Sequence, residues 1–230
     1  MPACRLASLI AILLIAACAA PPQTPTVQPP IRVATTISAQ PFTAAATDRT
    51  ANPGATFEIT LAASTSDLLE QVASGGVIGI TLFLPGESAL WGTPLGEEPI
   101  AVVVNPASII NNLTLAQVQD IFAGRTTGWA VAVREDGDDS RLAFESLTET
   151  KPALTSLVAP SPEAMLKFVA ETPNGIGYLP LRWMTDSVKA VAIDGRLPTD
   201  ADYKLKALVV AVAKEEPRGA AREWLGRVQK

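Results

Sequence analysis

Residues 100–129 carry the clearest folding signal in this chain. Apolar, mostly β-branched residues fill 100–104, and a run of five is too short for a buried helix, so it predicts a buried strand. An Asn-Pro pair at 105–106 ends that strand. Thr114 and Gln117 then stand three residues apart, as in a capping box, at the start of an apolar pattern of helical period. Strand, turn and capped helix in succession predict an α/β protein with largely parallel sheets.

The same stretch resembles a known family. After the apolar strand come Asn-Pro at 105–106, Asn-Leu-Thr at 112–114, Ile-Phe-Ala-Gly at 121–124 and finally Trp129. This order is similar to the mid-chain signature of the phosphate-binding-protein-like solute-binding proteins of ABC transporters. Weaker similarities extend from about residue 31 to the C-terminus. The alternative is a generic strand–helix unit that has no such relationship.

The resemblance implies a two-lobe, periplasmic-binding-protein-like (type II) α/β fold with a hinge between the lobes. Lobe I would combine residues 31–104 with residues 190–230. Lobe II would consist of residues 105–189, inserted between the two parts of lobe I. A hinge that closes two lobes on a ligand is a well-described mode of domain motion.

The N-terminus predicts export and lipid anchoring. Residues 1–17 read as a signal peptide, because a basic residue precedes an apolar run that is shorter than the roughly 20 residues a bilayer span needs. The small residues before Cys18 resemble a bacterial lipobox, which would make this cysteine the lipidated first residue of the mature chain. An ordinary signal peptide with an incidental cysteine is the alternative. Residues 18–30 are rich in proline and predict an extended tether to the membrane.

The composition excludes several classes of function. The chain has 230 residues, a net charge of −5 and no basic block, which argues against a nucleic-acid partner. It has no histidine, so the commonest general base and metal ligand are absent, and no Ser-x-x-Lys sequence replaces them. We therefore expect neither an enzyme nor a bound cofactor or metal. We expect a monomer.

The candidate ligand residues follow predicted strands at helix starts. Hydroxyl side chains at such junctions are often only N-caps, yet the free N–H groups of a helix start also suit an anion. By match to the family, a first turn after strand 31–35 and a second turn near residue 64 would contact the ligand, and an arginine after a later strand would add a charge-assisted contact. The resemblance implies these ligand-binding residues: Thr36, Ser38, Ala39, Ser64, Thr65, Ser66, Arg134, Gly137 and Ser140.

Two departures from the family pattern bear on the ligand. Val77 stands where the family has an aspartate that accepts a hydrogen bond from a protonated oxyanion, and valine cannot accept one. Asp138 and Asp139 stand where serine and glycine are expected. These carboxylates suit the helix dipole, but they would repel a phosphate or turn Arg134 into an internal ion pair. The acidic run 135–139 also admits a calcium site, although it lacks the spacing of an EF-hand loop.

Two hypotheses for function follow. In the first, the protein is an extracytoplasmic solute-binding lipoprotein, anchored to the bacterial cell membrane or envelope, that captures a small oxyanion such as phosphate for an ABC permease. In the second, it is a sensory or interaction lipoprotein on the same scaffold, with an altered or lost ligand site. Arg134 and Ser38 favour the first hypothesis, and Val77 with the Asp138–Asp139 pair favours the second.

Overall fold

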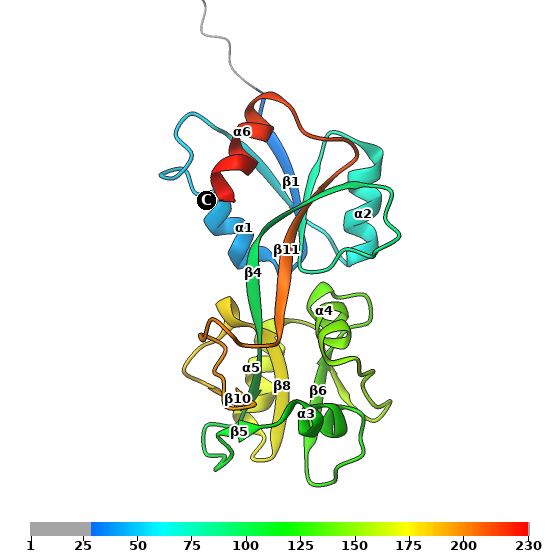
Figure 1. Cartoon of the computed structure of the whole chain (residues 1–230), viewed down its shortest axis with the longest axis vertical. Helices are drawn as coiled ribbons and strands as arrows, with labels where there is room; N and C mark the ends of the chain where they lie inside the picture. The colour runs from blue at the N-terminus through cyan, green and yellow to red at the C-terminus, as the bar shows by residue number, and fades with distance from the viewer. Residues whose placement is uncertain (1–28, 230) are drawn as a thin grey trace, which may run out of the picture.

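The computed structural model describes residues 29–229. The predicted signal peptide, the predicted lipidation site Cys18 and most of the predicted tether lie outside the described residues. The described chain forms two lobes stacked along its long axis, and the long strands β4 (Trp91–Val104) and β11 (Lys206–Ala213) run from one lobe to the other (Figure 1).

The elements alternate along the chain as an α/β protein requires. The helices are α1 (Gln40–Ala46), α2 (Thr65–Ser74), α3 (Leu115–Phe122), α4 (Asp139–Thr148), α5 (Pro162–Glu171), the single-turn η1 (Leu181–Trp183) and α6 (Gly219–Val228). The shorter strands are β1 (Ile31–Thr35), β2 (Phe57–Leu61), β3 (Ile78–Thr81), β5 (Asn112–Leu113), β6 (Ala130–Arg134), β7 (Leu157–Ala159), β8 (Gly175–Pro180), β9 (Lys189–Ala190) and β10 (Ala192–Ile193).

One mixed sheet links the lobes. Within the described residues its strand order is β2-β1-β3-β11-β4-β8-β6-β7, and β9 adds to β4. In the upper lobe of Figure 1, which contains β1, β2 and β3, strand β1 pairs in parallel with β2 and β3. In the lower lobe, which contains β6, β7 and β8, strand β6 pairs in parallel with β7 and β8. The central pairs of β11 with β3 and β4, and of β4 with β8, are antiparallel. The two-lobe α/β fold expected from the sequence is confirmed, with antiparallel pairs at its centre.

Strand pairing bears on where one lobe ends and the other begins. Ile100–Val104 pairs with β8, and β10 pairs with β5, so hydrogen bonds tie both segments to the lower lobe. The division predicted from the sequence assigned both segments to lobe I. Because β4 runs unbroken between the lobes, its sequence carries no mark of the crossing. Strand β4 pairs with β11 as far as Pro99 and with β8 from Ile100 onward, so we propose that the crossing between the lobes lies at this change of partner.

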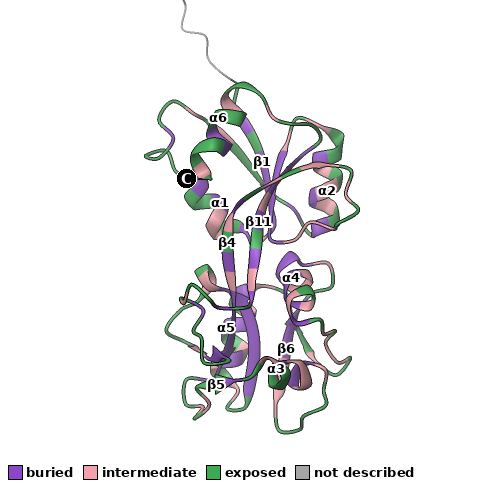
Figure 2. Ribbon diagram, viewed as in Figure 1, coloured by how far each residue is buried: buried purple, intermediate pink, exposed green. Residues whose placement is uncertain are grey.

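Each lobe has packed aromatic side chains in its core. In the lower lobe Phe144 stacks on Tyr178 with ring centroids 4.0 Å apart, and Phe122 packs against both. In the upper lobe Trp224 of α6 packs on Phe57 and donates a hydrogen bond to the carbonyl of Ala46. The buried residues follow the sheet through both lobes (Figure 2).

The central unit forms as the sequence predicts. Residues 100–104 are buried strand, and α3 begins at a complete capping box in which Thr114 and Gln117 bond to each other's backbone N–H. The strands expected at residues 31–35, 57–61 and 130–134 and the helix expected after Ser161 are also present. Local capping and apolar period are therefore enough to place these elements.

Candidate ligand site between the lobes

The candidate site lies where the first turn of α4 meets the carboxyl ends of β1 and β3. Thr36 and Ser38 follow β1, Thr81 ends β3, and Asp139 and Ser140 open α4 from the other lobe. All five are at least 98% buried. Figure 2 shows the buried N-terminal end of α4 facing the upper lobe. Open α/β sheets bind ligands at the carboxyl ends of their strands, so this is the expected place for a site.

Arg134 ends β6 and forms a buried ion pair. Its Nη2 donates to Oδ2 of Asp138 at 2.9 Å, and both side chains are more than 90% buried. Its Nη1 donates to the carbonyl of Ala159 at 2.6 Å. Of the two states that the sequence left open, the structure shows the internal ion pair.

The Asp138 carboxylate also joins two elements. It is the N-cap of α4, because its Oδ1 accepts from the backbone N–H of Ser140 at 3.0 Å and of Arg141 at 3.3 Å. The Ser38 hydroxyl lies 3.1 Å from each carboxylate oxygen and 3.2 Å from Oγ of Ser140. One carboxylate thus caps a helix, pairs with an arginine and binds a serine of the opposite lobe.

The Asp139 carboxylate is fully buried and bound by the upper lobe. Its Oδ2 accepts from Oγ1 of Thr36 at 2.6 Å, from the backbone N–H of Leu82 at 2.8 Å and from Oγ1 of Thr81 at 3.1 Å. Burial, followed by the charge of Asp138, raises the pKa of Asp139 to about 6, although these three donors act in the opposite direction. Near neutral pH this side chain is close to its titration range.

Only one of the three predicted residues in the turn near residue 64 contacts the other lobe. The backbone N–H and the hydroxyl of Thr65 both donate to the carbonyl of Gly137, at 3.0 and 2.8 Å. Gly137 has φ +81°, a left-handed conformation that favours glycine. Ser64 instead caps α2 through the N–H of Asp67, and its hydroxyl lies 2.9 Å from that of Ser66. Ser64 therefore acts as a capping residue, and Ser66 contacts the hydroxyl of that cap.

The structure brings most of the predicted residues together. Those that contact one another or the two aspartates across the lobes are Thr36, Ser38, Thr65, Arg134, Gly137 and Ser140. Ala39 is buried, and its N–H donates to Oγ1 of Thr36 at 3.3 Å within the same turn. That all nine contact a ligand remains a prediction, as does lipidation of Cys18.

Three further contributors were not predicted from the sequence. Thr81 and the N–H of Leu82 bind Asp139, and Nε1 of Trp183 in η1 donates to the carbonyl of Ser38 at 3.1 Å. The position of Thr81 at the carboxyl end of a parallel strand could have identified it, by the rule that identified Thr36. Trp183 carries no local signal, because its partner is 145 residues away.

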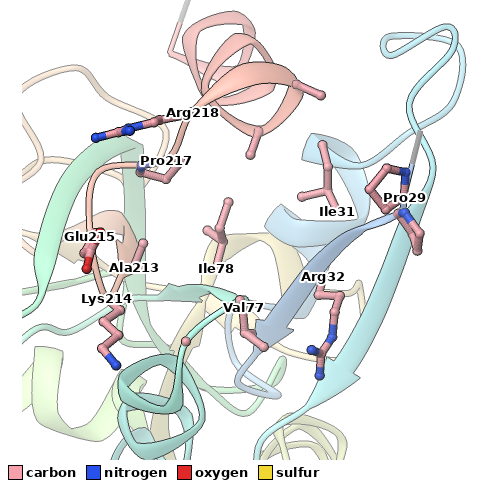
Figure 3. A pocket seen from close by; sticks show the side chains of 15 residues that line it. Pro29, Ile31, Arg32, Val77, Ile78, Ala213, Lys214, Glu215, Pro217 and Arg218 are labelled. Carbon is pink, nitrogen blue, oxygen red and sulfur yellow. The ribbon is translucent and has the colours of Figure 1, made fainter. Parts of the chain in front are cut away.

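Val77 lies far from this site, so the expectation that its side chain would face the bound oxyanion is wrong. It precedes β3 at the end of the sheet where β1 begins, and it lines an outer cavity of about 680 Å³ with Ile31, Arg32, Lys214 and Arg218 (Figure 3). Because β1 and β3 are parallel, their carboxyl ends, and not Val77, reach the other lobe. The residue type at position 77 therefore has no direct effect on an anion between the lobes.

Comparison with known proteins now decides the family. A family model described as a PBP superfamily domain matches residues 20–222, which is most of the chain. The chain belongs to the PBP superfamily. It is 28% identical over 213 residues to the phosphate-binding protein PstS of Bacillus subtilis (strain 168), covering 81% of this chain and 70% of that protein.

Two solved structures share this fold. A putative phosphate ABC transporter substrate-binding protein with bound phosphate from Clostridium perfringens has a TM-score of 0.76 at 24% identity, with 87% of this chain and 93% of that chain covered. An ABC-type phosphate transport receptor from Vibrio cholerae has a TM-score of 0.70 at 20% identity, with 87% and 93% covered. The two-lobe architecture is thus that of known substrate-binding proteins.

The carboxylates of the acidic turn in this PBP superfamily member point to different surroundings. Between residues 29 and 229, no group of three or more His, Cys, Asp or Glu side chains could hold a metal ion. Asp136 points outward, with its side chain 93% exposed and 3.9 Å from Arg141.

No helix within residues 29–229 combines the length and the apolar character that a membrane span needs.

Proposed function

We propose that this protein is an extracytoplasmic solute-binding lipoprotein that captures a small oxyanion, with phosphate as the first candidate, for an ABC transporter. The observation that carries the proposal is the donor set between the lobes. A guanidinium, hydroxyls and a backbone N–H converge there on carboxylate oxygens, and the same donor types bind phosphate. The names of the similar proteins from three bacteria support phosphate in particular.

Capture would use the two-lobe architecture without covalent chemistry. Thr36, Ser38 and Thr81 come from the upper lobe, and Arg134 comes from the lower, so only the closed form assembles the full set. Opening would expose the donors to solvent, and closure on a solute would bury them. The family consists of substrate-binding proteins, and we propose no enzymatic step for this member.

A thermal-shift panel followed by calorimetry tests this proposal. The panel contains phosphate, sulfate, molybdate, tungstate, small carboxylates, amino acids and Ca²⁺. A ligand at 100 times its Kd stabilises the folded state by about 2.7 kcal/mol, which a melting curve resolves. We expect stabilisation by phosphate, and we expect Ser38→Ala to weaken phosphate binding about tenfold by removing one anion donor. Ser74→Ala, at an exposed serine that ends α2, is the matched control.

A second candidate function is favoured by one specific observation. The guanidinium of Arg134 is already paired with Asp138, so the ligand site of this scaffold has altered. A sensory or interaction lipoprotein that no longer transports a solute would have such a site. If no ligand of the panel raises the melting temperature, oxyanion capture is contradicted and this second function is supported.

We further propose the export and anchoring that the N-terminus predicts. The signal peptide of residues 1–17, lipidation at Cys18 and a tether of residues 18–30 would hold a monomer at the cell membrane or envelope. Cys18→Ser should release the protein from the membrane fraction, and mass spectrometry should find a lipid-modified N-terminal cysteine only in the unchanged protein. Light scattering of the purified protein tests the monomer. Membrane retention of the Cys18→Ser variant would contradict lipid anchoring.

A further inference from the structure

We propose that Asp138 and Asp139 act as an internal anion, whose carboxylates occupy the donors of the site and hold the two lobes together when no solute is bound. A free oxyanion must then displace them before it can bind. Only the choice of phosphate as the displacing anion rests on the proposed function. The closure itself follows from contacts within the chain.

Asp139 carries most of this inference. It is the first residue of α4, yet all three of its hydrogen bonds come from the upper lobe, from Thr36, Thr81 and Leu82. Helix capping does not explain such bonds, because a cap binds the first N–H groups of its own helix. The side chain therefore acts between the lobes and not within α4.

Asp138 adds the charged part of the internal anion. Capping accounts for its bonds to the first N–H groups of α4, but not for Arg134 on β6 or for Ser38 in the opposite lobe. The same Ser38 is also bound through its carbonyl by Trp183. Ser38 is thus linked to the lower lobe on both sides, once by a carboxylate and once by an indole N–H.

The charges explain why a free anion would not simply join the two aspartates. The described side chains of the upper lobe that contact them are the hydroxyls of Thr36, Ser38 and Thr81, which are neutral. On β6 and α4 the nearby charges are Arg134 and Arg141, and Arg141 pairs with Glu145. Two carboxylates beside one available guanidinium leave a negative site when both are ionised, and a second anion would be repelled.

The fit of the internal anion is incomplete, which makes displacement feasible. Among the described residues, Nε of Arg134 and Oδ1 of Asp139 are buried without a hydrogen-bond partner. An unpaired buried polar atom lowers the stability of the state that contains it. The closed form without solute therefore keeps donor capacity at Arg134 that an oxyanion could use once Asp138 moves away.

The test compares the full chain with Asp138→Ser, Asp139→Asn and the double variant. Serine retains an N-cap oxygen and asparagine retains the shape of the side chain, so each change removes a carboxylate while the start of α4 is kept. Asp138→Ser also leaves the buried Arg134 guanidinium without its counter-ion, which lowers stability. Asp136→Ser is the matched control, because it removes a carboxylate from the same turn that points into solvent. Hydrogen exchange in phosphate-free buffer reports closure through the N–H groups of Thr65 and Leu82, which donate across the lobes. Calorimetry with phosphate then reports affinity.

We expect exchange at Thr65 and Leu82 to be at least tenfold faster in the double variant than in the unchanged protein, while strand β8 keeps its protection. We also expect the double variant to bind phosphate at least tenfold more tightly. Equal exchange in both proteins, or phosphate binding to both proteins with the same affinity, would overturn the inference. If the double variant opens but does not bind phosphate, the internal anion stands and phosphate capture fails. If the double variant does not fold, the single Asp139→Asn variant, which keeps the Arg134–Asp138 ion pair, decides by the same criteria.

Discussion

At the scale of single residues, the two aspartates at the start of α4 determine the electrostatics of the site. Asp138 neutralises Arg134, and Asp139 places a second carboxyl group among neutral donors of the opposite lobe. A buried ion pair contributes little net stability, but removing one partner leaves an uncompensated buried charge.

The first prediction concerns the pH dependence of folding. The pKa of Asp139 is raised from its ordinary value of 3.8 to about 6 by burial and by Asp138, so the folded state binds more protons than the unfolded state between about pH 4 and 6. Its favourable contribution is complete below pH 4 and is lost as the pH rises through 6, a loss on the order of 3 kcal/mol. Urea unfolding at several pH values should show this decline, and Asp139→Asn should abolish it. A parallel decline in both proteins would contradict the assignment.

The second prediction concerns the buried pair. Arg134→Ala leaves the Asp138 carboxylate without a counter-ion and should lower the free energy of unfolding by about 3–5 kcal/mol. Adding Asp138→Ser to Arg134→Ala should restore part of that loss, because no uncompensated charge then remains. Chemical unfolding of the two single variants and the double variant gives the coupling energy. Strictly additive losses would show that the two side chains do not stabilise each other.

At the scale of elements, helix starts serve two separate purposes in this fold. Helix α4 begins with carboxylates that bind the opposite lobe, whereas α2 and α3 begin with hydroxyl caps that serve only their own first turns. Sequence patterns alone do not separate these cases, since a serine, threonine or aspartate before a helix suits both. The partner of the side chain makes the difference, and that partner lies elsewhere in the chain.

The third prediction tests a purely local cap. In α3, Thr114 and Gln117 satisfy two backbone N–H groups reciprocally at an exposed helix start. Thr114→Ala should lower the free energy of unfolding by about 1 kcal/mol, within the usual range of 0.5–2, and leave ligand binding unchanged. Thr126→Ala, in the exposed turn that follows α3, is the control and should have no measurable effect. A change in phosphate affinity would show that α3 communicates with the site.

At the scale of the whole molecule, two kinds of contact join the lobes: the continuous strands β4 and β11, and side-chain contacts that can separate. We call this region, where β4 and β11 pass between the lobes, the waist. Strands β4 and β11 connect the lobes through the backbone, so they persist in any open form. The contacts of α4 and η1 with the upper lobe are side-chain contacts, and they can break without unfolding either lobe. Glu98 on β4 also belongs to this waist: burial raises its pKa, although the bonds from Arg182 of η1 oppose the shift.

The fourth prediction tests one separable contact. Trp183→Phe removes the indole N–H that bonds Ser38 but keeps most of the aromatic surface. Hydrogen exchange of the segment around Ser38 should accelerate, and the free energy of unfolding should fall by about 1 kcal/mol. Trp91→Phe, a half-buried tryptophan of β4 in the upper lobe, is the control. Unchanged exchange near Ser38 would show that this bond does not contribute to closure.

The sequence by itself was sufficient for the fold class and for most elements. The apolar run at 100–104, the capping box at Thr114 and the proline-led helix after Ser161 are all local signals, and each formed where it was expected. The residues of the central unit also carry the resemblance that predicted the family. Such signals succeed because helix caps, apolar period and turn residues act over a few neighbouring positions.

Only the tertiary structure decided how the site is occupied. The conflict at Asp138 and Asp139 was visible in the sequence, but its outcome depends on partners about 60 to 100 residues away, such as Ser38 and Thr81. The same limit explains Val77, which the sequence linked to the ligand and which the sheet places at its opposite end. Burial, register and the meeting of two lobes are properties of the assembled chain. They determine whether a carboxylate repels a ligand, caps a helix or takes the place of the ligand.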